Sequence, residues 1–339
     1  MSKIIERDVE KLVIELSKYK EKIEGKNFLV TGGAGFLGSW TCDVLSELGG
    51  NVICLDNFVT GSEKNIKHLL EKHKIKLVKN DVCDFNYDEK IDYIIHMASI
   101  ASPQIYQQNP VETLDSNIIG TKNMLELARK NKVEAFVFAS TSEVYGDSNE
   151  IPTPETYYGY VNPFGPRCMY DEGKRAGEAY CYSYFKKFGL PIRIARIFNT
   201  YGPRLDVENT IYGRVIVKFI KQSLKREPLT VYGDGTQTRS FCYVSDTING
   251  IMRLCLEENL DGEVFNIGNN EEIRIIDLAY KVKEITKSDS EIIFLPLPQD
   301  DPKRRCPDIS KARRLLGYEP KIGLEEGLKR TIDWFMEIV

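Results

Sequence analysis

Tyr170 and Lys174 stand four positions apart, a spacing that puts both side chains on one face of a helix. A tyrosine hydroxyl has an ordinary pKa near ~10, and an adjacent ammonium group favours its ionised form. Such a pair can take the proton of an alcohol near neutral pH. Both residues are therefore predicted to be catalytic, with Tyr170 as the base.

A second pair with the same spacing, Tyr182 and Lys186, shows that spacing alone does not identify the base. Tyr170 follows the proline-rich loop 162–166 and opens a helix, where a side chain can face a cleft. Tyr182 lies about three turns into the same helix and is predicted to serve packing. We therefore expect the first pair to be chemical and the second to be structural.

Thr141 supplies another hydroxyl, at the end of the apolar run 135–140. This run is predicted to be a parallel strand, and ligands of such sheets bind beyond the carboxyl ends of the strands. A hydroxyl at that place can meet the substrate oxygen that Tyr170 deprotonates. Thr141 therefore joins Tyr170 and Lys174 as a predicted catalytic residue.

Three glycines, Gly32, Gly35 and Gly38, follow the first apolar run and precede a predicted helix over 40–48. Glycines at this spacing allow a tight turn, a close approach of the backbone to a pyrophosphate and close seating of the helix on the sheet. The amino terminus of the helix then offers free N–H groups to phosphate. A dinucleotide is predicted to bind at this loop.

Asp56 ends the second apolar run, about 20 residues beyond the glycines, where a carboxylate accepts hydrogen bonds from both hydroxyls of a ribose. Its charge repels the 2′-phosphate of NADP, so the predicted cofactor is NAD. Asp81 is expected beside the adenine ring, with an ordinary strand-end aspartate as the alternative. The predicted cofactor contacts are Gly32, Gly35, Phe36, Leu37, Gly38, Asp56, Asn57, Asp81, Val82, Met97, Ala98, Tyr170 and Lys174.

Short apolar runs that alternate with helical stretches must position these residues. The runs are 28–31, 51–56, 75–79, 91–96, 135–140 and 191–196. Strand and helix alternation at this spacing predicts right-handed βαβ crossovers and an α/β fold of Rossmann type, with a doubly wound parallel sheet. A further run, 264–267, can rejoin this sheet after a helix over 245–256.

The pattern becomes irregular after Asn199, where glycines and prolines punctuate shorter apolar pieces. We therefore predict a NAD-binding domain and a smaller C-terminal lobe that binds the substrate. The domain is assigned to 26–199 and 236–267, and the lobe to 200–235 and 268–339.

Residues 1–25 are predicted to form a separate amphipathic helix before the first strand. Its apolar face carries Ile5, Val9, Leu12, Val13 and Leu16 amid lysine and glutamate. A face of this kind must be covered, either by the chain's own domain or by a partner subunit.

Charge and composition exclude several classes of protein. Lys and Arg (46) nearly balance Asp and Glu (50), so there is no broad basic surface for a nucleic-acid backbone. No run approaches the roughly 18 apolar residues of a membrane span, and the first residues lack the apolar core of a signal peptide. The eight cysteines show no metal-ligand spacing and indicate reduced thiols, which predicts a cytoplasmic protein without a metal.

His96, at the end of the run 91–96, is the candidate histidine for acid/base catalysis. No carboxylate or nucleophile stands beside it in the sequence. A structural histidine at a strand end is therefore the preferred interpretation.

Longer segments of the chain resemble a known family. They are 170–175 (YDEGKR), 195–204 (ARIFNTYGPR), 229–235 (LTVYGDG), 237–241 (QTRSF) and 305–309 (RCPDI). From about residue 26 onward the chain resembles the extended short-chain dehydrogenase/reductases and, within these, the UDP-glucuronate decarboxylases, which make UDP-xylose.

The resemblance implies a redox-neutral reaction on a UDP-sugar, carried out by a homodimer. Tyr170 removes the proton of the sugar 4-hydroxyl while NAD takes the C4 hydride, the resulting 4-keto acid loses carbon dioxide, and NADH returns the hydride to the 4-keto pentose. The implied substrate contacts, around the diphosphate and the sugar, are Asn199, Arg214, Tyr232, Arg239 and Arg305, with Ser142 and Glu143 at the sugar.

The chemistry of these side chains agrees with the implied roles, since guanidinium groups suit phosphate and carboxylate. Arg305 is assigned to the carboxylate or to the leaving carbon dioxide. Glu143 is assigned to a like-charge position that disfavours the carboxylate and relays a proton to C5.

Two departures from the family pattern bear on the substrate. Ile100 stands where a proline is usual, in the loop beside the nicotinamide. The segment 204–214 is longer than usual, with Tyr212 in place of an aspartate. Because this segment borders the nucleotide, base or sugar preference can differ.

Three rival functions stay open. A UDP-sugar 4-epimerase shares the cofactor and Tyr/Lys/Thr features, but related epimerases place small residues where this chain has Glu143. A 4,6-dehydratase typically carries Asp-Glu in place of Ser142-Glu143. A non-catalytic NAD-binding protein can share the same fold, although the intact Thr141, Tyr170 and Lys174 oppose this interpretation.

Overall fold

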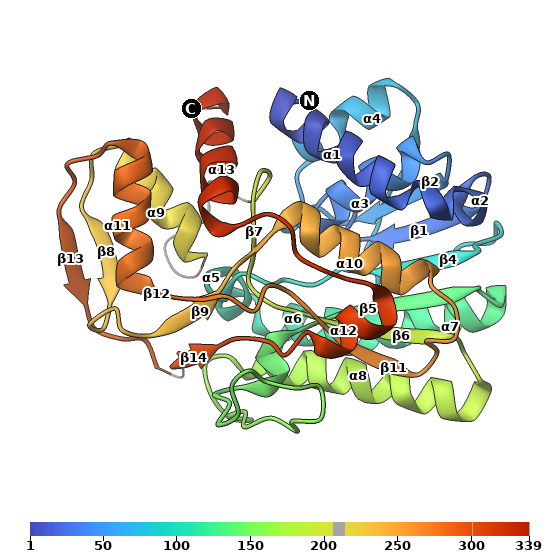
Figure 1. The fold of residues 1–339 in the computed structure, drawn as a ribbon. Coiled ribbons are helices and arrows are strands. Elements are labelled where there is room, and N and C mark those ends of the chain that lie inside the picture. The colour runs from blue at the N-terminus through green and yellow to red at the C-terminus, as the bar shows by residue number, and fades with distance from the viewer. Residues whose placement is uncertain (206–213, 300, 339) are drawn as a thin grey trace.

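A seven-stranded parallel sheet forms the centre of the larger part of the molecule (Figure 1). The computed structural model describes residues 1–205, 214–299 and 301–338. Its strands, in the spatial order β11-β6-β5-β4-β1-β2-β3, are β11 (Glu263–Ile267), β6 (Ile192–Ile197), β5 (Ala135–Thr141), β4 (Tyr93–His96), β1 (Asn27–Thr31), β2 (Asn51–Asp56) and β3 (Ile75–Lys79). All neighbouring pairs are parallel.

The predicted Rossmann-type α/β fold is confirmed, including the return of the run 264–267 to the sheet beside β6. The predicted strands differ from the observed ones by no more than two residues at either end. Strands β1 and β4 are neighbours at the point where the strand order reverses. Ligands of such sheets bind in the crevice beyond the carboxyl ends of these two strands.

Helices cover both faces of the sheet, as Figure 1 shows. Those above it in this view are α1 (Lys3–Leu16), α3 (Phe36–Glu47) and α10 (Val244–Leu256). Helix α8 (Cys168–Phe188) lies below it, packed against α6 (Pro110–Asp115), the π-helical turn η3 (Ser116–Gly120) and α7 (Thr121–Asn131). Each layer contributes to its own buried apolar cluster. Because both faces are covered, the strands are nearly continuous apolar runs.

Helix α1 packs on the chain's own domain, one of the two possibilities that the sequence allows. Ile5, Val9, Leu12 and Leu16 are buried, and the helix contacts α3 and α10. Polar contacts also tie it to the other end of the chain, because Asp8 forms a 2.7 Å ion pair with Arg330.

The smaller lobe lies to the left in Figure 1. Its elements are α9 (Val215–Leu224), β8 (Leu229–Tyr232), β9 (Thr238–Ser240), β12 (Glu272–Arg274), α11 (Ile275–Thr286), β13 (Ile292–Leu295), β14 (Arg304–Arg305) and α13 (Leu324–Ile338). Strand β8 pairs with β13, and β9 lies between β12 and β14. The division into domain and lobe at the predicted boundaries stays a prediction. The segment 236–267 was assigned to the NAD-binding domain, but its strand β9 pairs with β12 and β14 of the lobe.

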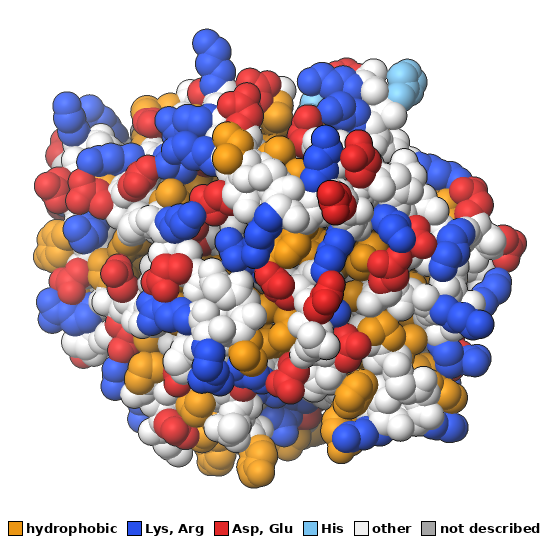
Figure 2. Space-filling model, turned by 45° about the vertical axis from the view of Figure 1, so that its right-hand side comes forward, with side chains coloured by type: hydrophobic (Ala, Val, Ile, Leu, Met, Phe, Trp, Pro, Cys, Tyr) orange, Lys and Arg blue, Asp and Glu red, His pale blue; other side chains and the backbone are white. Residues whose placement is uncertain are grey.

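Shorter elements complete the description. They are η1 (Ser17–Tyr19), α2 (Lys20–Ile23), η2 (Glu63–Asn65), α4 (Lys67–Glu71), α5 (Pro103–Gln108), η4 (Ser142–Tyr145), the parallel pair β7 (Thr200–Tyr201) and β10 (Cys242–Tyr243), and α12 (Ser310–Leu316). Within the described residues, no helix combines the length and the apolar character that crossing a bilayer requires. The face in Figure 2 carries acidic and basic side chains interspersed.

Candidate active site

A cavity of about 1150 Å³ opens beyond the carboxyl ends of the central strands. It lies at the place that the reversal of strand order indicates for a ligand. The predicted cofactor contacts that line it are Gly32, Gly35, Phe36, Leu37, Gly38, Asp56, Asn57, Asp81, Val82, Met97, Ala98, Tyr170 and Lys174. The structure therefore brings together residues that the sequence spreads over five segments, while their individual contacts to a cofactor stay predictions.

The glycine loop between β1 and α3 has geometry that only glycine allows. Gly32 has φ +66°, and a Cβ there would lie 3.0 Å from the backbone of Ala98. A Cβ at Gly38 would lie 2.1 Å from the carbonyl oxygen of Gly32, so this glycine lets α3 sit directly against the loop. Helix α3 thus begins at the cavity wall with its amino terminus, which suits a pyrophosphate. These residues fit NAD.

Asp56 is buried at the end of β2 and holds the glycine loop in place. Its carboxylate accepts hydrogen bonds from the backbone N–H groups of Ala34, at 2.9 Å, and Phe58, at 2.8 Å. Burial raises the pKa of Asp56, and these backbone hydrogen bonds oppose that shift. Carboxylate oxygens have further lone pairs, so Asp56 can also accept from a ribose. Beside it, Asn57 donates to Asp81 at 2.7 Å.

Tyr170, Lys174 and Thr141 meet in the same cavity. Tyr170 and Thr141 are joined by a hydrogen bond. Burial raises the pKa of Tyr170 well above its ordinary value, and the Thr141 hydrogen bond offsets only part of this shift. The Lys174 ammonium donates to the carbonyl oxygen of Ala139 at 2.8 Å, and burial lowers its pKa to about 7. The predicted three residues are therefore assembled, but Thr141, rather than Lys174, is the observed hydrogen-bond partner of the Tyr170 hydroxyl.

Tyr182 and Lys186 lie outside the cavity. The Tyr182 side chain is 62% exposed, and the Lys186 ammonium lies 5.5 Å from its ring centroid. The prediction that Tyr182 serves packing was wrong, because the helix turns this residue toward solvent. Neither residue of the second pair lines the large cavity, and the absence of a chemical role for this pair stays a prediction.

A buried set of charges lies beside Tyr170, where η4, the start of α8 and β14 meet. Arg305 forms an ion pair with Glu143, and Arg167 pairs with the other carboxylate oxygen of Glu143 at 2.5 Å. Burial raises the pKa of Glu143, but the two guanidinium groups outweigh it and hold the pKa at about 2. Glu143 therefore carries a negative charge near neutral pH, and the proton relay expected of it stays a prediction.

Sequence analysis missed Arg167 and Asp171 in this set. Arg167 Nε lies 3.8 Å from Asp171 Oδ2, one turn away on α8. Asp171 belongs to the segment 170–175 that carries the family resemblance, and Arg167 stands three residues before Tyr170. The position of Asp171 directly after the predicted base, in that segment, was the available signal for it, whereas Arg167 carried none. Ser142 lies within 3.5 Å of Arg305 at the same place.

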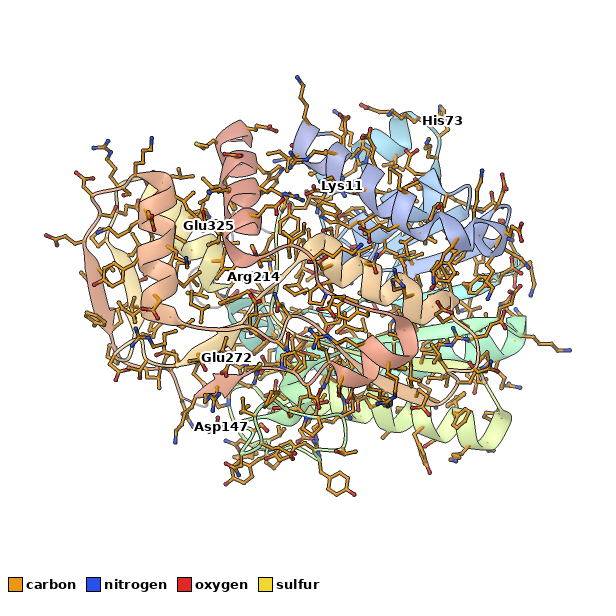
Figure 3. The ribbon with its side chains drawn as sticks, viewed as in Figure 1. Lys11, His73, Asp147, Arg214, Glu272 and Glu325 are labelled. Atoms are coloured by element: carbon orange, nitrogen blue, oxygen red, sulfur yellow. The ribbon has the colours of Figure 1, made fainter. Side chains whose placement is uncertain are left out.

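A second cavity, of about 240 Å³, adjoins the charged set. It is lined by the predicted substrate contacts Asn199, Arg214, Tyr232, Arg239 and Arg305, together with Glu143 and Arg167. Glu143, Asn199 and Arg214 also line the large cavity, so the two cavities share part of their walls. Figure 3 labels Arg214 near the middle of the molecule, between lobe and sheet. Arg239 forms a 2.9 Å ion pair with Asp301.

Two further sequence observations have different outcomes. Ile100 is buried in the small apolar cluster that also contains Tyr106 and Tyr170. Tyr212 lies outside the described residues.

His96 is structural, as preferred from the sequence. Its ring lies between Thr31, at 2.7 Å from Nδ1, and Thr121, at 3.1 Å from Nε2. Burial lowers its pKa to about 3, with a smaller contribution from Lys174. Among the described residues, no group of three or more His, Cys, Asp or Glu side chains could hold a metal ion.

The fold and the cavity define a dinucleotide-binding α/β protein with a Tyr/Lys/Thr set in the wall of the same cavity. The sequence pattern of the NAD dependent epimerase/dehydratase family matches residues 28–268, and the chain belongs to this family. NAD is therefore the cofactor, as Asp56 and the glycine loop predict.

Relatives of known function cover most of the chain. UDP-glucuronic acid decarboxylase 1 of Danio rerio is 48% identical over 318 residues, 94% of this chain and 74% of that protein. UDP-glucuronic acid decarboxylase 6 of Arabidopsis thaliana is 49% identical over 301 residues, 88% of this chain and 86% of that protein.

Among solved structures, a UDP-glucuronic acid 4-epimerase from Bacillus cereus in complex with UDP-glucuronic acid and NAD has a TM-score of 0.82 at 31% identity. The match covers 92% of this chain and all (100%) of that one. A UDP-glucose 4-epimerase from Thermotoga maritima with UDP-glucose has a TM-score of 0.84 at 33% identity, covering 92% and 99%.

Proposed function

We propose that this protein is an NAD-dependent UDP-glucuronate decarboxylase, which releases carbon dioxide and forms UDP-xylose. The observation that carries this function is the identity of 46–49% to UDP-glucuronic acid decarboxylases over 88–94% of the chain. The buried pairing of Glu143 with Arg305 beside Tyr170 supports it, because it puts cationic groups where a sugar carboxylate would stand.

NAD, when bound, supplies the oxidation of the sugar at C4 and its later reduction, so that the cycle is redox-neutral. Tyr170 takes the proton of the 4-hydroxyl, and Thr141 holds the same oxygen through its hydroxyl. Lys174, buried below this pair with its ammonium on the Ala139 carbonyl, offers a positive charge to the reacting end of the cavity. No side chain outside this set of three needs to move the 4-hydroxyl proton.

Oxidation at C4 makes the sugar a β-keto acid. Loss of carbon dioxide then leaves the electron pair of the broken C5–C6 bond on the 4-keto oxygen, where the hydroxyl groups of Tyr170 and Thr141 can donate hydrogen bonds. C5 next takes up a proton from solvent, which restores the 4-keto group for the returning hydride. Arg305 binds the carboxylate before it leaves. Its pairing with Glu143 limits how tightly it can hold the carboxylate, which matters because only interactions that strengthen in the transition state accelerate a reaction.

The second cavity is proposed to take the uridine diphosphate. Arg214 and Arg239 face it as diphosphate contacts, since a guanidinium group can bind phosphate through two hydrogen bonds. Asn199 lines both cavities and is placed to contact the sugar between them. Tyr232 lines the wall farther from Tyr170, among residues of β8 and α9.

The rival function is 4-epimerisation of UDP-glucuronate, favoured by the similarity to the Bacillus cereus 4-epimerase. Incubation with UDP-glucuronate, followed by proton NMR of the products, separates the two. We expect UDP-xylose, whose C5 carries two protons. UDP-galacturonate, with one proton at C5 and its carboxylate kept, would establish the epimerase instead.

The protein is further proposed to act as a homodimer. Val111 and Leu114 on α6 and Ile119 on η3 have exposed apolar side chains, and both elements pack against α8. Exposed apolar side chains that gather on one face mark contact surfaces. Sedimentation should show a dimer that Ile119→Asp converts to monomer. Ile14→Asp, at an exposed apolar residue on α1, is the matched control and should leave the dimer intact.

A cytoplasmic location is part of the same proposal. All eight cysteines are free, and six of them are buried. Buried thiols without disulfides favour a reducing compartment. Imaging of a fluorescent fusion in cells is expected to show diffuse cytoplasmic signal, and secretion into the medium would contradict it.

A further inference from the structure

Four charged or titratable side chains are packed into one buried set beside Tyr170: Glu143, Arg167, Asp171 and Arg305. The two arginines hold the two oxygens of Glu143, and Arg167 is shared with Asp171, whose Oδ2 lies 3.8 Å from its Nε. Asp171 has only 6% of its surface exposed. It lines neither cavity, whereas Arg167 and Arg305 line the second one.

The surroundings of Asp171 do not favour the ionised form of its side chain. Its Oδ1 is buried and has no hydrogen-bond partner among the described residues. An ionised oxygen without a partner in a buried site is costly, so the neutral carboxyl group is favoured. Burial, followed by the charge of Glu143, raises the pKa of Asp171 to about 8.

The other charged groups that face Asp171 come from η4, from β14 and from the start of α8. Arg167, before α8, and Arg305, on β14, favour its ionised form, whereas Glu143, on η4, and Glu172, on α8, oppose it. The Tyr106 ring, on α5, stacks on Tyr170 at 5.4 Å between centroids and adds a buried hydroxyl without a partner among the described residues.

The proton on Asp171 decides how many negative charges a second carboxylate meets in this set. With Asp171 neutral, a ligand carboxylate beside Arg305 meets the charge of Glu143 alone. With Asp171 ionised, it would meet two carboxylates, and like charges in a buried site disfavour one another.

We infer that Asp171 is a positioning residue that must carry a proton for the site to accept a sugar carboxylate, so that binding of a carboxylate-bearing UDP-sugar takes up a proton. It acts through Arg167, which contacts both Asp171 and Glu143. This inference rests on the proposed function, because it assumes that UDP-glucuronate is the ligand.

The test compares UDP-glucuronate with UDP-xylose, which lacks only the carboxylate. NAD-loaded Tyr170→Phe protein, which should bind without turnover, is titrated by calorimetry in two buffers of different ionisation enthalpy. At pH 8.5, UDP-glucuronate should take up more protons than UDP-xylose, and the difference should vanish at pH 6.5. Lys218, whose pKa burial lowers to about 8, also lines the second cavity, but it meets the diphosphate of both ligands and cancels in the difference.

Asp171→Asn, added to the same protein, keeps the size of the side chain and removes its titration. We expect the proton difference to disappear, and the Kd for UDP-glucuronate to become flat between pH 7 and pH 9, where the parent weakens roughly tenfold. A proton difference that persists in Asp171→Asn would overturn the inference. If this variant fails to fold, the pH dependence of the two Kd values in the parent decides: equal slopes overturn the inference.

Failure of the proposed function gives a different result. If the wild type forms UDP-xylose but the proton difference is absent, the function stands and the inference falls. If the difference is present but the wild type leaves the carboxylate in place, the function falls and the role of Asp171 stands. A parent protein that does not bind UDP-glucuronate would overturn the inference as well.

Discussion

The two Tyr-Lys pairs of α8 share one sequence pattern and lie in opposite environments. Tyr170 is 8% exposed, bonded to Thr141 and flanked by a buried set of charges. Tyr182, on the same helix, is 62% exposed, and its lysine lies over its ring in solvent. The difference teaches that spacing brings two side chains together, whereas a hydroxyl becomes a useful base only where strand ends and neighbouring elements enclose it.

The largest expected effect separates the two pairs directly. Tyr170→Phe should lower kcat by ~10²–10⁴-fold, since it removes the proton acceptor and leaves the ring on Tyr106. Tyr182→Phe, the matched control, should change kcat less than twofold. Steady-state kinetics with UDP-glucuronate measures both, and equal losses in the two variants would break the comparison.

The next effect concerns the charged side chains beside Tyr170, which have no counterpart at Tyr182 among the contacts described above. Glu143→Gln leaves Arg167 and Arg305 without their shared carboxylate, so they should hold the substrate carboxylate more tightly in the ground state. We expect kcat to fall by about 10-fold or more while KM stays constant or falls. A raised KM with unchanged kcat would remove Glu143 from the reaction and leave it a binding residue.

Asp56 lines the same cavity as Tyr170, and its substitution should affect the binding of the cofactor alone. Asp56→Ala removes the carboxylate that repels the 2′-phosphate of NADP, so the preference for NAD should fall by about 10-fold. Calorimetry with the two cofactors on wild type and variant measures the ratio. Equal affinities in the wild type would contradict the assignment of Asp56.

The smallest expected effect is on the pH dependence of stability, in which the buried Lys174 should differ from the exposed Lys186. Burial lowers the pKa of Lys174 to about 7, below its unfolded value of ~10.4. Between these pH values the unfolded chain binds more protons, so this residue's contribution to stability rises with pH and is lost as pH falls toward 7.

Lys174→Met should therefore gain about 2 kcal/mol relative to wild type between pH 9 and pH 7, at about 1.36 kcal/mol for each pH unit. Lys186→Met, at the exposed pair, should show no such pH dependence. Urea unfolding at both pH values measures the difference. If the difference in unfolding free energy between Lys174→Met and wild type stayed constant with pH, burial would not lower the pKa of Lys174.

Local patterns predicted the parts of the site that a single segment builds. The glycine loop, Asp56 and the start of α8 each follow from a short stretch whose neighbours in sequence are also its neighbours in space. The exposure of Tyr182 was predictable in principle, because twelve residues at about 100° each bring it roughly 120° around the helix from Tyr170.

Contacts between distant segments were beyond such patterns. Arg305 stands 162 residues from Glu143, and only the family resemblance joined them. Arg167 carried no separate signal, because an arginine before a helix is commonly a surface residue, and its burial depends on β14 and η4 closing over it. The unpartnered oxygen of Asp171 likewise follows from packing around the residue and not from its own segment.

The most direct test of the central claim uses UDP-glucuronate labelled with ¹³C at C6, followed by carbon NMR with three proteins. With wild type and Tyr182→Phe, the label should leave the sugar carboxylate and appear as carbon dioxide and bicarbonate at the same rate. With Tyr170→Phe it should stay on UDP-glucuronate. Label that remains on the sugar with the wild type, moving to UDP-galacturonate, would contradict the account.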